Sequence, residues 1–364
     1  MQFKQLVIFF LGLLALVPSL IISQTPSSLP SEIDKKLETY YKNQAFNGNI
    51  LIAKGGKILY EASYGFANQK LGIKNQSESK FLIGSATKSF TAIAILQAFE
   101  RGLLDLHTPI QKYLPELNNG VGKLTLHHLM KNSSGLPVHL NRVTELSYRD
   151  ISSRELIQLY QTLSLSFAPG SQYEYSNLNY QLCALVLERV SGLSYQEYLQ
   201  QYVFRPLNMN NSGVERTKQV AIDKAIGYQL EEAKLVEAQR NYMSYAMGGG
   251  DIYSTALDLL KWDQALYTET LLSPASKELL FDGQEGQFGT YGYGFKVKVY
   301  ERGSGVYPEG KLVRHGGSMF GYICNIHRYL DDQVCIIVLG NMRPYPTMEI
   351  TLVIEDLLRK HQII

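Results

Sequence analysis

The 364-residue chain has few cysteines and little net charge, and each shortage excludes a class of protein. Its three cysteines, Cys183, Cys324 and Cys335, show no spacing typical of a metal cluster or a disulfide framework. The formal net charge is only +2, and no Lys/Arg-rich block stands out. Without a basic patch the chain lacks the electrostatic footprint of a nucleic-acid-binding protein. We therefore expect no nucleic-acid partner, no metal and no cofactor.

A disulfide is not expected within the predicted hairpin that contains two of the cysteines. Cys324 and Cys335 flank a turn at Asp331-Asp332. Counting outward from this turn places Cys335 opposite Arg328 and not opposite Cys324. Buried free thiols are the preferred interpretation.

The chain also lacks internal repeats and, beyond its leader, low-complexity tracts. Apolar residues make up 45% and charged residues 19% of the sequence. This balance is ordinary for a globular protein that buries a sizeable core. The length is too great for one small core but suits a single large enzyme domain with two lobes.

The N-terminus departs from this average composition. Lys4 precedes uninterrupted apolar sequence over residues 6–17, and a Pro-Ser break and the small residue Ser23 follow. This order predicts a signal peptide over residues 1–23 and then a linker over residues 24–31. An uncleaved leader is the alternative, because the apolar stretch approaches the length that spans a bilayer. We expect a periplasmic or secreted protein that contacts a membrane only through an uncleaved leader.

Strand signals lie at both ends of the remaining chain. A hairpin is predicted over residues 48–62 with Gly55-Gly56 as its turn, and residues 87–267 are mostly helical in period. An amphipathic helix over residues 32–41 precedes the hairpin, and a helix over residues 346–359 ends the chain. Four strands follow the helical part, at residues 292–300, 311–316, 322–329 and 333–339.

This order predicts one two-lobed domain over residues 32–362. If the first and last strands join one sheet, the fold is α/β of the α+β type, with an antiparallel sheet flanked by helices. The helical stretch forms a large inserted lobe, and the cleft between the lobes is the expected place for an active site.

The motif Ser85-Ala-Thr-Lys88 opens a stretch that is apolar on nearly every face and ends at Gly102. Such a helix is buried, and two residues three apart lie on one face of it. Burial and the helix N-terminus both disfavour the charged form of Lys88. A neutral amine can take the proton from Ser85 Oγ and so activate a weak hydroxyl nucleophile. The alternative is an N-cap serine beside a lysine that reaches solvent.

A second motif lies at Tyr175-Ser176-Asn177. In extended chain Tyr175 and Asn177 point the same way, and Ser176 or Asn177 caps the helix that follows. A phenol beside a lysine can shuttle a proton, and an amide can hold a substrate carbonyl. A surface loop is the alternative in a chain with 25 tyrosines.

A third motif, His315-Gly316-Gly317-Ser318, follows a predicted strand. Paired glycines let a ligand approach the backbone closely. The N–H of Ser318 and that of Ser85 could together form an oxyanion hole. A Gly-rich turn is the alternative. The adjacent His127 and His128 face different directions and are interpreted as structural.

Together the three motifs resemble those of the serine β-lactamase and penicillin-binding-protein superfamily, in its class C-like branch. That branch also contains DD-peptidases, D-aminopeptidases and esterases. The resemblance covers residues 46–341, with further matches at residues 124–136, 167–170, 247–255 and 338–341.

The resemblance implies a role for each motif residue. Ser85 is the acylated nucleophile, Lys88 its activating amine and Tyr175 a partner in proton transfer. Substrate-binding roles are implied for the remaining motif residues: Asn177, His315, Gly317 and Ser318. The implied reaction is attack on an amide or ester carbonyl, a covalent acyl-Ser85 intermediate and transfer of the acyl group to water.

The third motif also departs from the pattern of true class C β-lactamases, which have Lys-Thr-Gly there. His315-Gly316-Gly317 lacks the hydroxyl, and histidine is largely neutral at pH 7. Strand alternation points Arg314 away from the His315 face. We therefore expect a peptidase of the D-amino-acid or peptidoglycan type, or an esterase, acting on a small-molecule or peptide substrate of cell-wall origin. A true β-lactamase and a non-catalytic cell-wall-binding protein on the same fold are the alternatives.

Overall fold

The structure is a computed structural model that describes most of the chain after the predicted signal peptide. It covers residues 28–42, 46–140, 143–215, 224–232, 234–286, 289–303 and 307–364. The predicted signal peptide lies outside these ranges, as does the linker up to residue 27. Within these ranges no helix has both the length and the apolar character needed to cross a bilayer.

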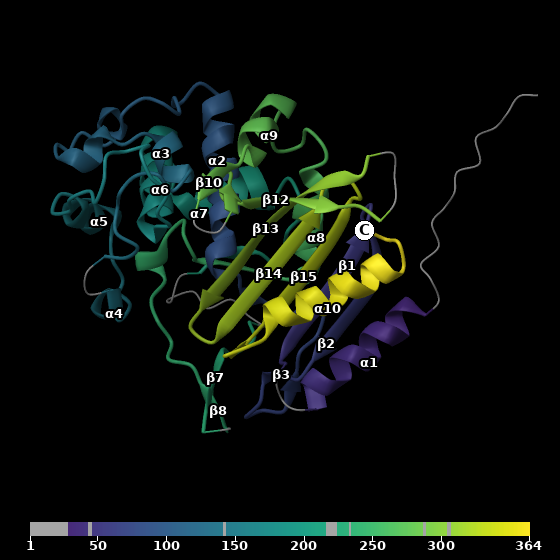
Figure 1. The fold of residues 1–364 in the computed structure, drawn as a ribbon. Coiled ribbons are helices and arrows are strands. Elements are labelled where there is room, and N and C mark those ends of the chain that lie inside the picture. Colours follow the sequence, from purple (N-terminus) through teal and green to yellow (C-terminus); the bar gives the residue numbers. More distant parts are fainter. Residues whose placement is uncertain are drawn as a thin grey trace, which may run out of the picture.

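An eight-stranded antiparallel sheet crosses the centre of the molecule (Figure 1). Its order is β10-β11-β12-β13-β14-β15-β1-β2, so the predicted N-terminal hairpin lies beside β15, with Ile50 opposite Val338. The first and last strands therefore join one sheet, as predicted. The strands are β1 (Gly48–Lys54), β2 (Lys57–Tyr64), β10 (Gln284–Gly286), β11 (Gly289–Tyr291), β12 (Lys296–Glu301), β13 (Glu309–Met319), β14 (Tyr322–Tyr329) and β15 (Val334–Gly340).

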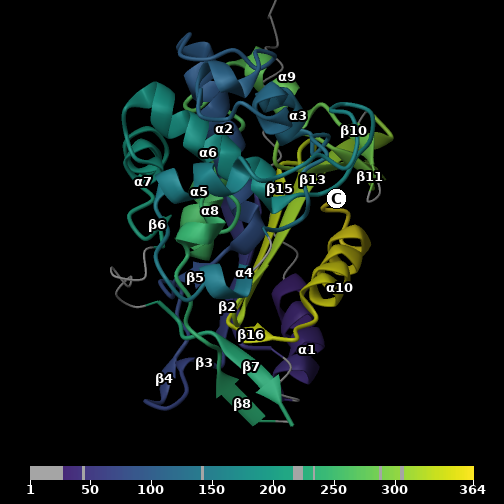
Figure 2. The same ribbon diagram turned by 90° about the vertical axis from the view of Figure 1, so that its left-hand side faces the viewer.

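The two faces of this sheet belong to different cores because side chains alternate along each strand. Ile50 and Val338 pack with the helices α1 (Leu29–Lys42) and α10 (Thr347–Lys360). Leu51 belongs to the larger core, which includes the helical lobe. In Figures 1 and 2, α1 and α10 accordingly lie on one side of the sheet, and α8 (Ala256–Ala265) lies on the other.

The helical lobe is inserted between β2 and β10, and it is less purely helical than predicted. Its helices, with α8, are α2 (Thr87–Glu100), α3 (Leu126–Met130), α4 (Val143–Leu146), α5 (Ser153–Tyr160), α6 (Asn177–Ser191), α7 (Tyr195–Leu199) and α9 (Pro274–Phe281). Short strands form three small additional sheets: β3 (Phe66–Asn68) with β4 (Ile73–Lys74); β5 (Phe81–Leu82), β9 (Ile252–Ser254) and β6 (Gly213–Val214); and β16 (Met342–Arg343), β7 (Tyr228–Glu231) and β8 (Lys234–Glu237). Strands of two to four residues are too short to show an alternating pattern in the sequence.

The hairpin register confirms the interpretation of the cysteines. Cys335 pairs with Arg328, and Cys324 pairs with Leu339. All three cysteines of the chain are buried and free.

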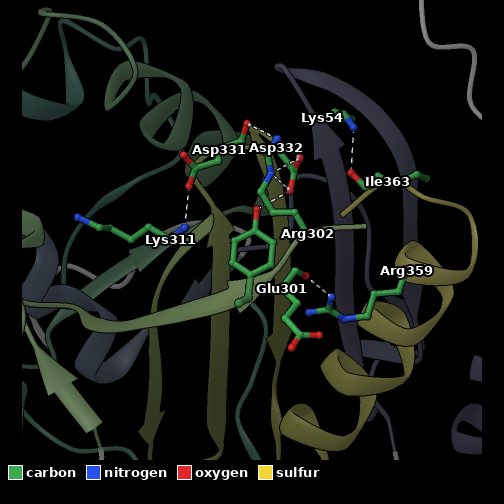
Figure 3. Close-up of polar contacts among 9 residues, drawn as sticks. Lys54, Glu301, Arg302, Lys311, Asp331, Asp332, Arg359 and Ile363 are labelled. Atoms are coloured by element: carbon green, nitrogen blue, oxygen red, sulfur yellow. Dashed lines mark hydrogen bonds and ion pairs between the residues drawn. The ribbon is translucent and has the colours of Figure 1, made fainter. Parts of the chain in front are cut away.

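The turn predicted at Asp331-Asp332 fixes one end of the sheet (Figure 3). The Asp332 carboxylate accepts hydrogen bonds from the hydroxyl of Tyr300 and, at 2.7 Å, from Arg302 Nη2. Asp331 accepts the backbone N–H of Lys311 at 2.6 Å. These contacts join β12, the start of β13 and the turn between β14 and β15.

The C-terminal segment is held at the same end of the sheet (Figure 3). Arg359 in α10 donates to the backbone carbonyl of Glu301 at 2.7 Å. Lys54, at the end of β1, donates to the carbonyl of Ile363 at 2.9 Å. The last helix is therefore fixed against the sheet by polar contacts as well as by its apolar face.

A buried ion pair connects α8 to the sheet. Arg328 Nε in β14 lies 2.5 Å from Asp263 Oδ1 in α8, and both side chains are 0% exposed. Arg328 Nη2 also donates to the Asp263 carbonyl at 3.0 Å. Because both charges have left water, removal of one partner would leave the other uncompensated in the core.

We predict that Asp263→Ala lowers the free energy of unfolding by about 3–5 kcal/mol, measured by urea denaturation. The control is Lys42→Ala, which breaks the exposed pair Lys42–Glu38 and should cost no more than about 0.5 kcal/mol. Equal losses in the two variants would contradict the assignment of Arg328–Asp263 as a buried pair whose disruption is costly.

Candidate active site

Ser85 lies in one turn of 3₁₀ helix, η1 (Gly84–Ala86), immediately before α2. The predicted helix is therefore present, but its α-helical part begins at Thr87. Nearly all of α2 is buried, and Lys88 is 0% exposed, as its all-round apolar composition predicts. Gly102, with a φ of 70°, follows the helix as expected.

The Lys88 amine is surrounded by three oxygen atoms from separate parts of the chain. Its Nζ lies 3.1 Å from Ser85 Oγ, 2.7 Å from Asn177 Oδ1 and 2.7 Å from the carbonyl oxygen of Gly249. Burial lowers the pKa of Lys88 to about 7, against an opposing effect of the Asp251 carboxylate. A substantial fraction of this amine is therefore neutral at neutral pH.

The geometry suits a neutral amine that accepts a proton. A neutral amine has two N–H groups and one lone pair. The Asn177 and Gly249 oxygens can only accept, so they take the two N–H groups. The lone pair is then available to the hydroxyl of Ser85, which can donate its proton.

Tyr175 completes this group from the other side of Ser85. Burial raises the pKa of Tyr175, against a smaller opposing effect of the Ser85 side chain, so the phenol stays protonated. Lys88 Nζ lies 5.1 Å from the centre of the Tyr175 ring. Tyr175 and Asn177 reach one site as predicted, and of the two capping candidates Ser176 is the N-cap of α6.

The third motif lies in β13, which runs directly past the turn that holds Ser85. A Cβ atom at Gly317 would lie 1.8 Å from the Ile83 carbonyl oxygen and 2.8 Å from Ser85 N. A Cβ atom at Gly84, where φ is 52°, would lie 2.7 Å from Ser318 N. Only glycine fits at both positions, and this close approach brings the N–H groups of Ser85 and Ser318 together.

Both ring nitrogens of His315 are hydrogen-bonded to other groups of the protein, so neither is available to a bound anion. Its Nδ1 lies 2.6 Å from the Gly316 carbonyl and its Nε2 lies 3.1 Å from the Tyr291 hydroxyl. Because the carbonyl can only accept, Nδ1 carries the proton and Nε2 accepts from Tyr291. Burial, reinforced by Lys88, lowers the pKa of His315 to about 3. Its side chain is neutral and supports the ring of Tyr175, 6.4 Å away between ring centres.

A pocket of about 340 Å³ opens beside Ser85. Its described lining combines residues of both lobes: Ser85, His139, Leu140, Asn177, Leu178, Tyr245, Ala246, Gly249, Ser318, Met319, Phe320 and Arg343. Three of the predicted site residues, Ser85, Asn177 and Ser318, line this pocket. Lys88 contacts three of the lining residues, Ser85, Asn177 and Gly249. Because residues of β13 and of the helical lobe line the pocket together, it lies in the cleft that the sequence predicts.

Several residues of the site were not predicted as functional. Gly249 and Asp251 lie in the Gly-rich segment at residues 247–255, whose match to the family was the available signal. His139, whose ring nitrogens lie 3.3 and 3.4 Å from Asn177 Nδ2, and Arg343 belong to no predicted motif.

His127 and His128 have structural contacts, as expected. The His127 Nδ1 lies 2.7 Å from the Tyr293 hydroxyl, and His128 completes the capping box of α3 with Thr125. No group of three or more His, Cys, Asp or Glu residues in the described part of the chain could hold a metal ion. Because the buried Lys88 amine lies within hydrogen-bond distance of Ser85 Oγ, the arrangement around Ser85 suits acyl transfer through a hydroxyl nucleophile.

Known proteins share this sequence and fold. The chain is 33% identical over 264 residues to the putative penicillin-binding protein PbpX of Bacillus subtilis, covering 72% of this chain and 65% of that protein, just under two thirds of its length. It is 26% identical to the teichoic acid D-alanine hydrolase of Staphylococcus aureus, covering 90% and 78%. The crystal structure of a penicillin-binding protein from Bacillus halodurans superposes with a TM-score of 0.76 at 27% identity, covering 88% and 98%.

A family model described as Beta-lactamase matches residues 33–355, which is most of the chain. The resemblance predicted from the three motifs is thereby confirmed, and so is the fold. The chain belongs to the β-lactamase family, together with penicillin-binding proteins.

Proposed function

We propose that this protein is an exported serine hydrolase that cleaves an ester or amide bond through a covalent acyl-Ser85 intermediate. The observation that carries the proposal is the environment of Lys88, whose buried amine has two oxygen acceptors besides Ser85 Oγ. This arrangement directs the lone pair of the neutral amine at the nucleophile. A serine hydroxyl without such a base is a weak nucleophile.

Acylation uses these groups in a fixed order. Ser85 Oγ attacks the substrate carbonyl while its proton passes to Lys88 Nζ, and the carbonyl oxygen becomes an oxyanion. The N–H groups of Ser85 and Ser318 stabilise that charge. The bond to the leaving group then breaks, and the leaving group takes a proton that Lys88 supplies through the Tyr175 hydroxyl.

Deacylation repeats the sequence with water. Lys88 and Tyr175 accept a proton from a water molecule as it attacks the acyl carbonyl, and the same N–H pair stabilises the second oxyanion. The bond to Ser85 Oγ breaks, and Ser85 regains its proton. The products are an acid and the alcohol or amine released in the first half of the reaction.

The substrate we favour carries a D-amino acid, as an ester or as a peptide. The relative from Staphylococcus aureus is described as a teichoic acid D-alanine hydrolase. The third motif argues against efficient β-lactam hydrolysis, because His315 is neutral and hydrogen-bonded through both ring nitrogens. Glycine at position 316 offers no hydroxyl in place of the Thr of Lys-Thr-Gly. The predicted signal peptide supports action outside the cytoplasm.

We predict that a fluorophosphonate probe labels Ser85 and that Ser85→Ala abolishes the adduct, measured by intact-protein and peptide mass spectrometry. Hydrolysis of a D-alanyl ester should fall on the order of 10⁴–10⁶-fold in the same variant. The control is Ser89→Ala, which removes a buried α2 hydroxyl bonded only to the Ala86 carbonyl among the described residues. An unlabelled wild-type protein that still binds cell-wall material would favour the non-catalytic alternative.

We predict that p-nitrophenyl esters and D-alanyl peptides are turned over faster than a chromogenic cephalosporin. The reason is the lack of a cation and hydroxyl at the third motif. The measurement is kcat/KM for each of the three substrates with the same enzyme preparation. Rapid cephalosporin hydrolysis without ester or peptide activity would identify a β-lactamase instead.

We predict that Lys88→Arg lowers acylation by about 10²–10⁴-fold although it keeps the positive charge, because a guanidinium stays protonated and cannot act as the base. Burst kinetics with an activated ester measure acylation separately from turnover. A variant that retains most of the burst rate would show that Lys88 is not the base.

A pH dependence follows from the lowered pKa of Lys88. The neutral amine is the active form, so kcat/KM should rise with pH up to about 7 and level off above it. Asp251→Asn removes the carboxylate that raises this pKa and should move the midpoint to lower pH. A midpoint near the ordinary value for lysine, or no response to Asp251→Asn, would contradict the assignment.

A further inference from the structure

Arg343 is a cation of the active-site pocket that the reaction described above does not use. It follows the buried Met342 in the short strand β16 and lines the same pocket as Ser85, with its side chain exposed. Among the described residues it forms no ion pair, and its guanidinium has no oxygen acceptor. A guanidinium without an internal partner at the edge of a reaction site is available to a ligand.

The described residues that line this pocket carry charge of one sign. The described residues that line it include no Asp or Glu, and Arg343 is the charged side chain among them. The remaining lining is mostly apolar or aromatic, with Leu140, Tyr245 and Phe320 as examples. A bound anionic group therefore meets an attractive charge here and no opposing carboxylate from the pocket wall.

The position of Arg343 is fixed by its neighbours along the chain. Asn341 is 0% exposed, and its side chain donates to the carbonyls of Phe66 at 3.0 Å and Ile226 at 2.7 Å. Its Oδ1 accepts from Asn47 Nδ2 at 2.9 Å. Arg343 itself is paired with Gln229 of β7. The backbone at Arg343 is thus held at a defined position beside the pocket by strand pairing and by the buried contacts of Asn341.

The group that binds an anion in true class C β-lactamases is absent from this chain. The third motif has a neutral imidazole and no hydroxyl, and His315 contacts Tyr291 and Gly316. Recognition of an anionic substrate would therefore require a cation from another element. Arg343 comes from β16, outside the third motif, and its planar fork matches the oxygens of a carboxylate or phosphate.

We propose that Arg343 binds a carboxylate or phosphate group of the substrate while the scissile carbonyl lies at Ser85. This inference rests on the proposed function and adds the substrate class: esters or amides of a D-amino acid that carry an anionic group. The two sources of such a group are the C-terminal carboxylate of a peptide and the phosphodiester or phosphomonoester of a polyol phosphate.

The test uses two matched pairs of substrates. One pair is an N-acetylated D-alanyl-D-alanine peptide with a free C-terminal carboxylate and the same peptide as its C-terminal amide. The other pair is the D-alanyl ester of glycerol phosphate, which is charged at the phosphate, and the D-alanyl ester of glycerol, which lacks the phosphate. In the wild-type protein we expect the charged member of one pair to have a kcat/KM about 10- to 100-fold higher than its neutral partner. The pair that shows the preference identifies the source of the anion.

Arg343→Gln should bring this ratio close to one, mainly through a higher KM for the charged substrate. Arg343→Lys should retain part of the preference, because an ammonium keeps the charge but not the bidentate geometry. Arg205→Gln, at an exposed arginine that is not among the described lining residues, should leave the ratio unchanged. Equal kcat/KM within both pairs, or an unchanged ratio in Arg343→Gln, would overturn the proposal.

A binding measurement separates this proposal from the proposed function. Ser85→Ala cannot be acylated, so binding of glycerol phosphate and of acetyl-D-alanine to it, followed by NMR titration, reports the anion site alone. Weaker binding of one of these anions by at least about tenfold in Ser85→Ala/Arg343→Gln supports the site even if no substrate is turned over. Equal binding in the single and double variants contradicts it. Failure of fluorophosphonate labelling in the wild type would count against the acyl-enzyme only.

Discussion

The site depends on one desolvated amine, that of Lys88. Its charged form is disfavoured by burial in a helix that has no solvent-facing side at this point, and this lowers its pKa to about 7. Its three neighbours come from the turn before α2, from the start of α6 and from the Gly-rich segment before β9. The helical lobe and the turn that holds the nucleophile must therefore pack correctly for the amine to be oriented as well as neutral.

The sheet contributes through backbone contact, not through charged side chains. Gly317 and Gly84 allow β13 and η1 to approach each other closely, and the backbone nitrogens of Ser85 and Ser318 lie near each other as a result. His315 is uncharged and supports Tyr175, which leaves Arg343 as the cation at the pocket edge. Burial lowers the pKa of both groups: it makes the Lys88 amine reactive, and it leaves His315 neutral and so without a charge that could bind an anion.

Much of this arrangement could be predicted from the sequence, because its determinants are local. The apolar composition of α2 predicts the burial of Lys88, and the turn at Asp331-Asp332 predicts the register of Cys335 and Arg328. The short strands β5 to β9 and β16 could not be predicted, since they are too brief to show a period. Arg343 was missed for a different reason, because only the tertiary fold brings β16 to the pocket that contains Ser85.

The central claim is that Lys88 is a neutral base at physiological pH, and its own titration tests this most directly. NMR of the protein labelled with ¹³C at the lysine Cε atoms, with Lys88→Met to assign the signal, measures the pKa of the amine without reference to any substrate. The account predicts one lysine that titrates near pH 7, well below the ordinary value of 10.5. A Lys88 signal that titrates near 10.5 would contradict it.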